Sequence, residues 1–117
     1  MFSEIRNINQ LLVEATTQEL YTALIQQLNK DFLLANIDYI IAENSTPIEL
    51  KQHLYLLIEK LINTQFDTFL SLLYRIDISE NKIKHLPKEN FEVYIATVSF
   101  LILKREWQKV WFRKKYS

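Results

Sequence analysis

Glycine and cysteine are absent from this chain of 117 residues, and proline occurs only twice. Without cysteine there can be no disulfide scaffold, thiolate zinc site or cysteine nucleophile. Without glycine there can be no glycine-rich phosphate loop or dinucleotide-binding fingerprint. Tight hairpins also lose the residue that adopts positive φ most readily. A sheet of short strands would therefore be difficult to build from this sequence, whereas an all-helical fold would not.

Long hydrophobic runs are missing as well. The longest nearly apolar stretch, Val93 to Leu103, has 11 residues and contains Thr97 and Ser99, whereas a membrane-spanning helix needs about 20. The first four residues lack a basic stretch followed by an apolar one, so we expect no secretion signal. These observations predict a cytoplasmic protein without a transmembrane segment.

The residues that are present are typical of one helical domain. The hydrophobic fraction of 49% is too high for a disordered chain, and the length suits a single core. Apolar residues recur at helical spacing nearly throughout. We therefore expect an all-α bundle of four to five helices, with a long, largely buried C-terminal helix that ends in a basic aromatic segment.

The N-terminal part of the chain predicts two helices. The first covers residues 4–15, with Ser3 as its cap. Residues 16–19, Thr-Thr-Gln-Glu, have the pattern of a capping box that would start the second helix. Its end is open: the helix could break at residues 29–31 or continue toward Ile41.

The clearest boundary lies in the middle of the chain. Thr46 is predicted as an N-cap, Pro47 as the first helical residue and Glu49 as the partner that completes a capping box. The apolar stripe of the helix that follows shifts by one position near Asn63 and Thr64. This shift indicates either a kink or a break.

A short helix is expected to begin near Ser79 and to stop before Pro87. The last helix is expected from residue 88 or 90 to about residue 114. Its first half, residues 93–103, is rich in β-branched residues and could form a buried strand if taken alone. Because it has no turn and runs without interruption into Lys104, we predict a buried helix.

Charge is segregated along the chain, although the total is zero. Residues 104–117 contain six basic side chains against one acidic side chain, a net charge of +5. Residues 1–103 contain eight basic and thirteen acidic side chains, a net charge of −5. We therefore divide the single domain into an acidic helical bundle, 1–103, and a basic aromatic extension, 104–117, whose residues are expected to project from the bundle.

This extension is the predicted partner-binding site. Trp107, Trp111 and Arg113 would anchor a partner, because Trp and Arg are enriched at binding hot spots. The other cations would steer an acidic surface toward them. The complete set of predicted contact residues is Lys104, Arg105, Trp107, Lys109, Trp111, Phe112, Arg113, Lys114 and Lys115.

Other interpretations of the same segment remain open. The cations could complement the C-terminal end of the helix dipole and pair with acidic helices of the same chain or of a partner subunit, while the two tryptophans pack on the bundle. The segment could instead bind nucleic acid, with cations on phosphates and aromatic rings on bases. An anionic membrane surface is a further alternative, in which the aromatic side chains act as anchors.

Tyr74, Arg75 and Asp77 form a possible secondary binding corner at a helix end. Within it, Asp77 or Ser79 could cap the short helix, with Arg75 neutralising Asp77.

Catalytic and metal-binding patterns are weak. Glu49 and His53 are four residues apart, which differs by one from the spacing of di-iron bundles. We therefore predict no metal, no cofactor and no enzymatic activity.

Aromatic residues suggest self-association. The chain has fifteen Phe, Tyr and Trp residues, more than a bundle of this size needs. Four phenylalanines (Phe32, Phe66, Phe69 and Phe91) are expected in the core. The helix around residues 54–62 looks apolar over a wide arc that a small bundle cannot cover. The overall prediction is a protein-interaction or scaffold module that binds an acidic partner or a second copy of itself; the alternative is a nucleic-acid-binding protein.

Overall fold

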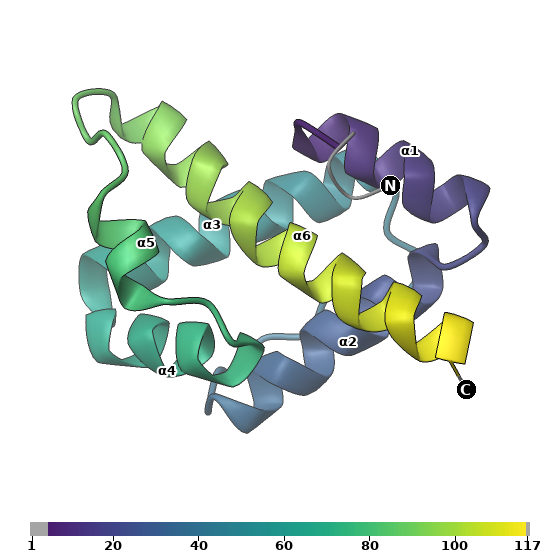
Figure 1. Cartoon of the computed structure of the whole chain (residues 1–117). Helices are drawn as coiled ribbons and strands as arrows, with labels where there is room; N and C mark the ends of the chain where they lie inside the picture. The colour runs from purple at the N-terminus through teal and green to yellow at the C-terminus, as the bar shows by residue number, and fades with distance from the viewer. Residues whose placement is uncertain (1–4, 117) are drawn as a thin grey trace.

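The computed structural model describes residues 5–116, which form six helices and no strand (Figure 1). The predicted all-α bundle is confirmed, with six helices in place of four to five. The helices are α1 (Ile8–Thr17), α2 (Tyr21–Leu34), α3 (Pro47–Thr64), α4 (Phe66–Ile76), α5 (Glu80–Lys84) and α6 (Phe91–Tyr116).

α6 is the central element of the bundle. It crosses the molecule in Figure 1 and packs against α1, α2, α3 and α4. The stretch 93–103 is helical throughout, as expected, but burial does not stop there: Trp107 and Val110 also lie in the core. The segment from residue 104 onward therefore does not project as a whole, since packing continues to Val110. No helix of residues 5–116 is long and apolar enough to cross a membrane.

α3 begins with the capping box that the sequence predicts. The Glu49 backbone N–H donates to the Thr46 hydroxyl at 3.2 Å, and the Glu49 carboxylate accepts from the Thr46 backbone N–H at 2.8 Å. Pro47 occupies the first turn, where its missing N–H costs nothing. This capping box fixes the end of the long loop that leads from α2 into α3.

The shift of the apolar stripe near residue 64 corresponds to a break between two helices, not to a kink within one. Gln65, at φ −145° and ψ 57°, ends α3 and begins α4. The Thr64 hydroxyl donates to the Lys60 carbonyl within α3, so it does not cap α4. Leu61 of α3 and Phe69 of α4 lie on either side of the break and are both buried in the same core.

Three helices are followed within two residues by a residue in the left-handed region, and none of these residues is glycine. Glu19, Asn36 and Asp77 have φ values of 59°, 61° and 67° and follow α1, α2 and α4. The capping box expected at residues 16–19 does not form: the Thr16 hydroxyl donates to the Leu12 carbonyl inside α1. α2 ends at Leu34, between the two ends considered from the sequence.

Asparagine side chains cap the first and last helices. The Gln10 backbone N–H donates to the Asn7 side chain at 2.9 Å, so α1 begins at Ile8, later than expected. Ser3, the expected cap, lies outside the described residues. The Val93 backbone N–H donates to the Asn90 side chain at 3.1 Å at the start of α6. Asn90 is one of the two start points that the sequence allowed.

Candidate protein-interaction surface

Helical periodicity divides the predicted contact residues between the core and the surface. Trp107 is 0% exposed and lies in the hydrophobic core. The prediction that Trp107 anchors a partner does not agree with this position, because a fully buried ring has no surface to offer. Packing on the bundle, the alternative interpretation, describes Trp107 correctly.

Two of the predicted cations face α2. Lys109 donates to the Asp31 carboxylate at 2.8 Å, and its Nζ lies 3.2 Å from Glu106 Oε1. Arg113 donates to the side-chain oxygen of Gln27, whose amide in turn donates to Asp31 at 3.0 Å. We call these five residues the α2/α6 polar cluster. It uses Lys109 and Arg113 for contacts within the fold.

Glu106 is the least expected member of this cluster, because it is fully buried. Within residues 5–116, the positively charged group beside its carboxylate is the Lys109 ammonium, 3.2 Å from Oε1. Burial, together with the hydrogen bond and the negative charge of Asp31, raises the pKa of Glu106 to about 9. Lys109 opposes this shift but does not cancel it, and a protonated Glu106 carboxyl can donate to Asp31.

Asp31 is the ionised partner of this pair. Burial disfavours its charge, but hydrogen bonds with Glu106, Lys109 and Gln27 and the charge of Lys109 outweigh burial and lower the pKa of Asp31. The pair therefore shares one proton beside one cation. The two carboxyl groups and Gln27 are buried, whereas Lys109 is half-buried and Arg113 is exposed at the edge of the cluster.

The predicted secondary corner lies next to α6. Arg105 and Asp77 form an ion pair at 3.6 Å, so Asp77 is neutralised by α6 and not by its neighbour Arg75. Tyr74 and Arg75 are exposed. Ser79 precedes α5 without a side-chain hydrogen bond to the helix. The structure thus joins one residue of the corner to one residue of the extension, in a shallow hollow of about 360 Å³ that Lys104 also lines.

The C-terminal turns of α6 carry an aromatic group with one lysine over it. Lys115 Nζ lies 4.9 Å from the centre of the Trp111 ring, within cation–π range. Phe112 and Tyr116 stack at 5.9 Å, and both are exposed. Lys114 Nζ reaches the Gln18 carbonyl at 3.5 Å. We call residues 111–116 the basic aromatic end.

Sequence reasoning missed a second surface at the opposite end of α6. A groove of about 440 Å³ runs between α3 and α6. Leu56 is 64% exposed and Val93 is 59% exposed beside it, and Glu59 and Glu92 lie at its edges. We call this the α3/α6 groove; its lining residues are Tyr55, Leu56, Glu59, Phe91, Glu92, Val93, Ile95 and Ala96.

The only sign of this groove in the sequence is the wide apolar arc of α3, which includes Leu56. Phe91 was expected in the core, and so was Phe66, but both are exposed, whereas Phe32 and Phe69 are buried as predicted.

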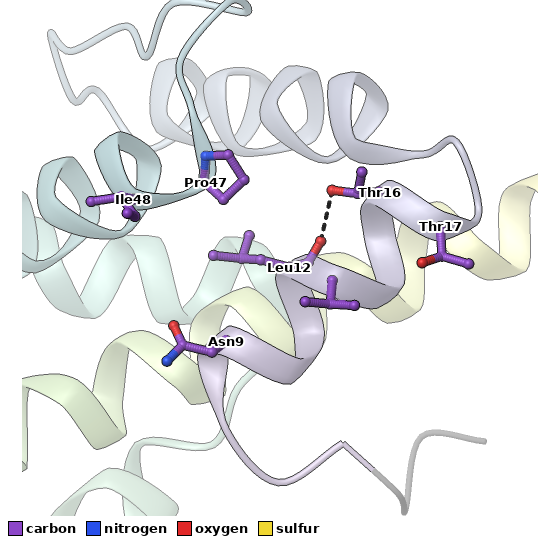
Figure 2. Close-up of a pocket in the computed structure, with 7 residues that line it drawn as sticks. Asn9, Leu12, Thr16, Thr17, Pro47 and Ile48 are labelled. Carbon is purple, nitrogen blue, oxygen red and sulfur yellow. Dashed lines mark hydrogen bonds between the residues drawn. The ribbon is translucent and has the colours of Figure 1, made fainter.

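A further apolar pocket lies between α1 and the first turn of α3 (Figure 2). It has a volume of about 330 Å³, and Leu12 and Pro47 contribute to its wall. Val13 and Ile48 in its lining are 66% and 69% exposed. No charged residue lines this pocket, whereas two glutamates border the α3/α6 groove. It provides a matched reference surface of similar exposure but different electrostatic character.

Within residues 5–116 no three His, Asp or Glu side chains gather in a way that could hold a metal ion. His53, which the sequence placed beside Glu49, has its Nδ1 2.5 Å from the Tyr39 hydroxyl. Comparison of the chain with protein-family models, curated proteins and solved structures found no match.

Proposed function

We propose that the chain is a non-catalytic protein-interaction module whose contact surface is the outer side of α6, from the α3/α6 groove to the basic aromatic end. The observation that carries this proposal is the groove itself. Leu56 and Val93 are each more than half exposed and stand together with Phe91 across two helices. Exposed apolar patches with a polar edge are typical of protein interfaces.

Electrostatics support the same surface. The groove is bordered by two acidic side chains, and the other end of the same helix carries Lys114 and Lys115. Charged edges of this kind raise the rate of association and fix the orientation of the partner more than they raise affinity. The proposed surface is therefore broader than the extension predicted from the sequence. It omits Trp107, which is buried, and Lys109 and Arg113, whose side chains bond to α2.

A role without catalysis is supported by the position of Glu106, the one carboxyl group of residues 5–116 whose pKa is raised to about 9. A general acid or base must reach its substrate. Glu106 is 0% exposed between α6 and α2, and it lines neither the groove nor the pocket of Figure 2. We assign it to stability.

Capture from a cell extract with the immobilised protein tests the proposed function. Leu56→Glu places a charge in the α3/α6 groove. Ile48→Glu makes the same kind of change on the same helix, at a residue of similar exposure that lines the reference pocket. We expect the first variant to lose the captured protein and the second to retain it, with equal helicity in both.

Equal capture by both variants would contradict the proposed surface. Capture of nucleic acid in place of protein, with binding that falls steeply as salt rises, would favour the nucleic-acid alternative.

A further inference from the structure

We infer that the partner of this surface is a second copy of the chain, bound so that the two α6 helices lie antiparallel across a two-fold axis. This inference rests on the proposed function and names its partner. It follows from the unlike chemistry of the two ends of α6. One end forms an acidic apolar groove with α3, and the other is basic and aromatic.

Spacing along α6 defines the strip that would meet the second copy. Val93, Thr97, Phe100, Lys104, Gln108, Trp111 and Lys115 follow one another at intervals of three or four, so they share one side of the helix. Val93 and Lys115 at its ends are exposed, and the residues between them are half-buried, with Phe100 and Trp111 packed in part against the core. The strip thus runs from the groove to the basic aromatic end, and the fully buried residues of α6 lie between its members in the sequence.

An antiparallel pair brings unlike ends together twice. With the axis near Lys104, residue 93 of one copy lies level with residue 115 of the other. Lys115 of each copy then approaches Glu92 and Glu59, the two acids beside the groove of its partner. A parallel pair would instead place acid on acid and base on base. Charge complementarity therefore selects the antiparallel arrangement.

The geometry of a two-fold dimer suits this surface. In such a dimer one patch binds the same patch of the other subunit, so a surface must complement itself after rotation. The strip meets that condition because its two ends differ in sign and lie at opposite ends of one helix. α6 has 26 residues, so it is about 39 Å long, which is comparable with the extent of 35 Å along the longest principal axis of the molecule. The contact would extend over the whole molecule.

One feature of the strip opposes the dimer and makes the axis testable. Lys104 lies near the axis, so the two copies of this ammonium group would approach each other. Its Nζ lies 5.7 Å from the centre of the Phe100 ring, which keeps it close to the strip. Lys104→Gln removes both charges and is expected to tighten the dimer several-fold, whereas the same change at a surface cation away from the axis would not have this effect.

Sedimentation velocity at low salt tests the arrangement by charge exchange. We expect a reversible dimer for the unmodified chain. Lys115→Glu and Glu92→Lys each turn two attractive contacts into repulsive ones, so each variant alone should associate about tenfold more weakly. An equal mixture of the two should dimerise again. In the mixed dimer the carboxylate introduced at position 115 meets the ammonium introduced at position 92, while the native pair forms on the other side. Lys30→Glu, at an exposed position on α2, is the matched control and should dimerise normally.

Two results would overturn the inference. A monomer at all concentrations excludes a second copy as the partner, and the capture experiment with Leu56→Glu then decides separately whether the surface binds a different protein. A dimer that Lys115→Glu leaves intact, or a mixture that does not recover, excludes the antiparallel arrangement.

Discussion

Lys109 and Lys115 are the same residue type in the same basic segment of the same helix, yet their surroundings differ. Lys109 donates to a buried carboxylate of α2, whereas Lys115 lies over an aromatic ring at the exposed end of α6. Charge content alone therefore does not define a binding site. The rotation of each position about the helix axis decides whether a cation stabilises the fold or remains available to a partner.

The two sides of α6 also differ in how they handle charge. On the inner side, the buried carboxyl groups of the α2/α6 polar cluster keep a charge only where a neighbouring group stabilises it, because burial penalises an unpaired charge. On the outer side, solvent screens the charges, so individual pairs contribute little to stability. The inner side of α6 should therefore determine the stability of the fold and its pH dependence. The outer side should determine association.

The largest expected difference between the two sides comes from their aromatic residues. Trp107→Ala removes a fully buried ring and should lower the free energy of unfolding by about 3–5 kcal/mol. Tyr116→Ala removes a ring that is 73% exposed and should change it by less than about 0.5 kcal/mol. Urea denaturation followed by circular dichroism measures both, and equal losses would show that the division of α6 is wrong.

The pH dependence of stability should arise from the inner side of α6. The pKa of Glu106 is raised to about 9 in the folded state, so the folded chain holds a proton there that the unfolded chain releases near its ordinary pKa. Stability is therefore greatest below that ordinary pKa and falls as pH rises toward 9, by at most about 1.4 kcal/mol per pH unit. Asp31, whose pKa is lowered, acts in the opposite sense, and its contribution is lost only in stronger acid.

Glu106→Gln tests this assignment, because an amide cannot ionise but can still donate to Asp31. We expect the variant to be more stable than the native chain at pH 8 and to lose most of the decline between pH 5 and 9. Glu92→Gln, an exposed position on the same helix, should retain the native pH dependence. A native chain whose stability does not change over this range would contradict a protonated Glu106.

A smaller difference is expected between two cations near the end of the helix. Arg113→Ala leaves the buried Gln27 without its donor and should cost about 1 kcal/mol of unfolding free energy. Lys115→Ala should cost less than about 0.5 kcal/mol, since solvent replaces its contact. Thermal melting of the two variants in parallel measures the difference, and a larger loss for Lys115→Ala would reverse the assignment.

Parts of the fold were predictable because their causes are local. The capping box of Thr46 and Glu49 needs only residues three apart, and it was read correctly. The left-handed residue Glu19 gave no such signal, because glutamate has no preference for positive φ. The start of α2 was misplaced for this reason: the Thr-Thr-Gln-Glu pattern was present, but α1 continues to Thr17 and the chain turns at Glu19.

The site was only partly predictable. An apolar stripe continues at helical spacing to Trp107 through Ile95, Val98, Ile102 and Leu103. This spacing predicts that Trp107 is buried, but the basic residues around Trp107 led us to assign it to the surface. The α3/α6 groove could not be read in the same way. Leu56 and Val93 meet only after α3 packs on α6, and that contact depends on the whole core.

Measuring both properties on Lys109→Ala and Lys115→Ala tests the division of α6 most directly. Each variant would be followed by urea denaturation for stability and by sedimentation velocity for association. We expect Lys109→Ala to lower the free energy of unfolding but to leave the association of the folded chain unchanged, and Lys115→Ala to weaken association with native stability. If one variant changed both properties, or if the two effects were exchanged, the two sides of α6 would not have the separate roles assigned to them.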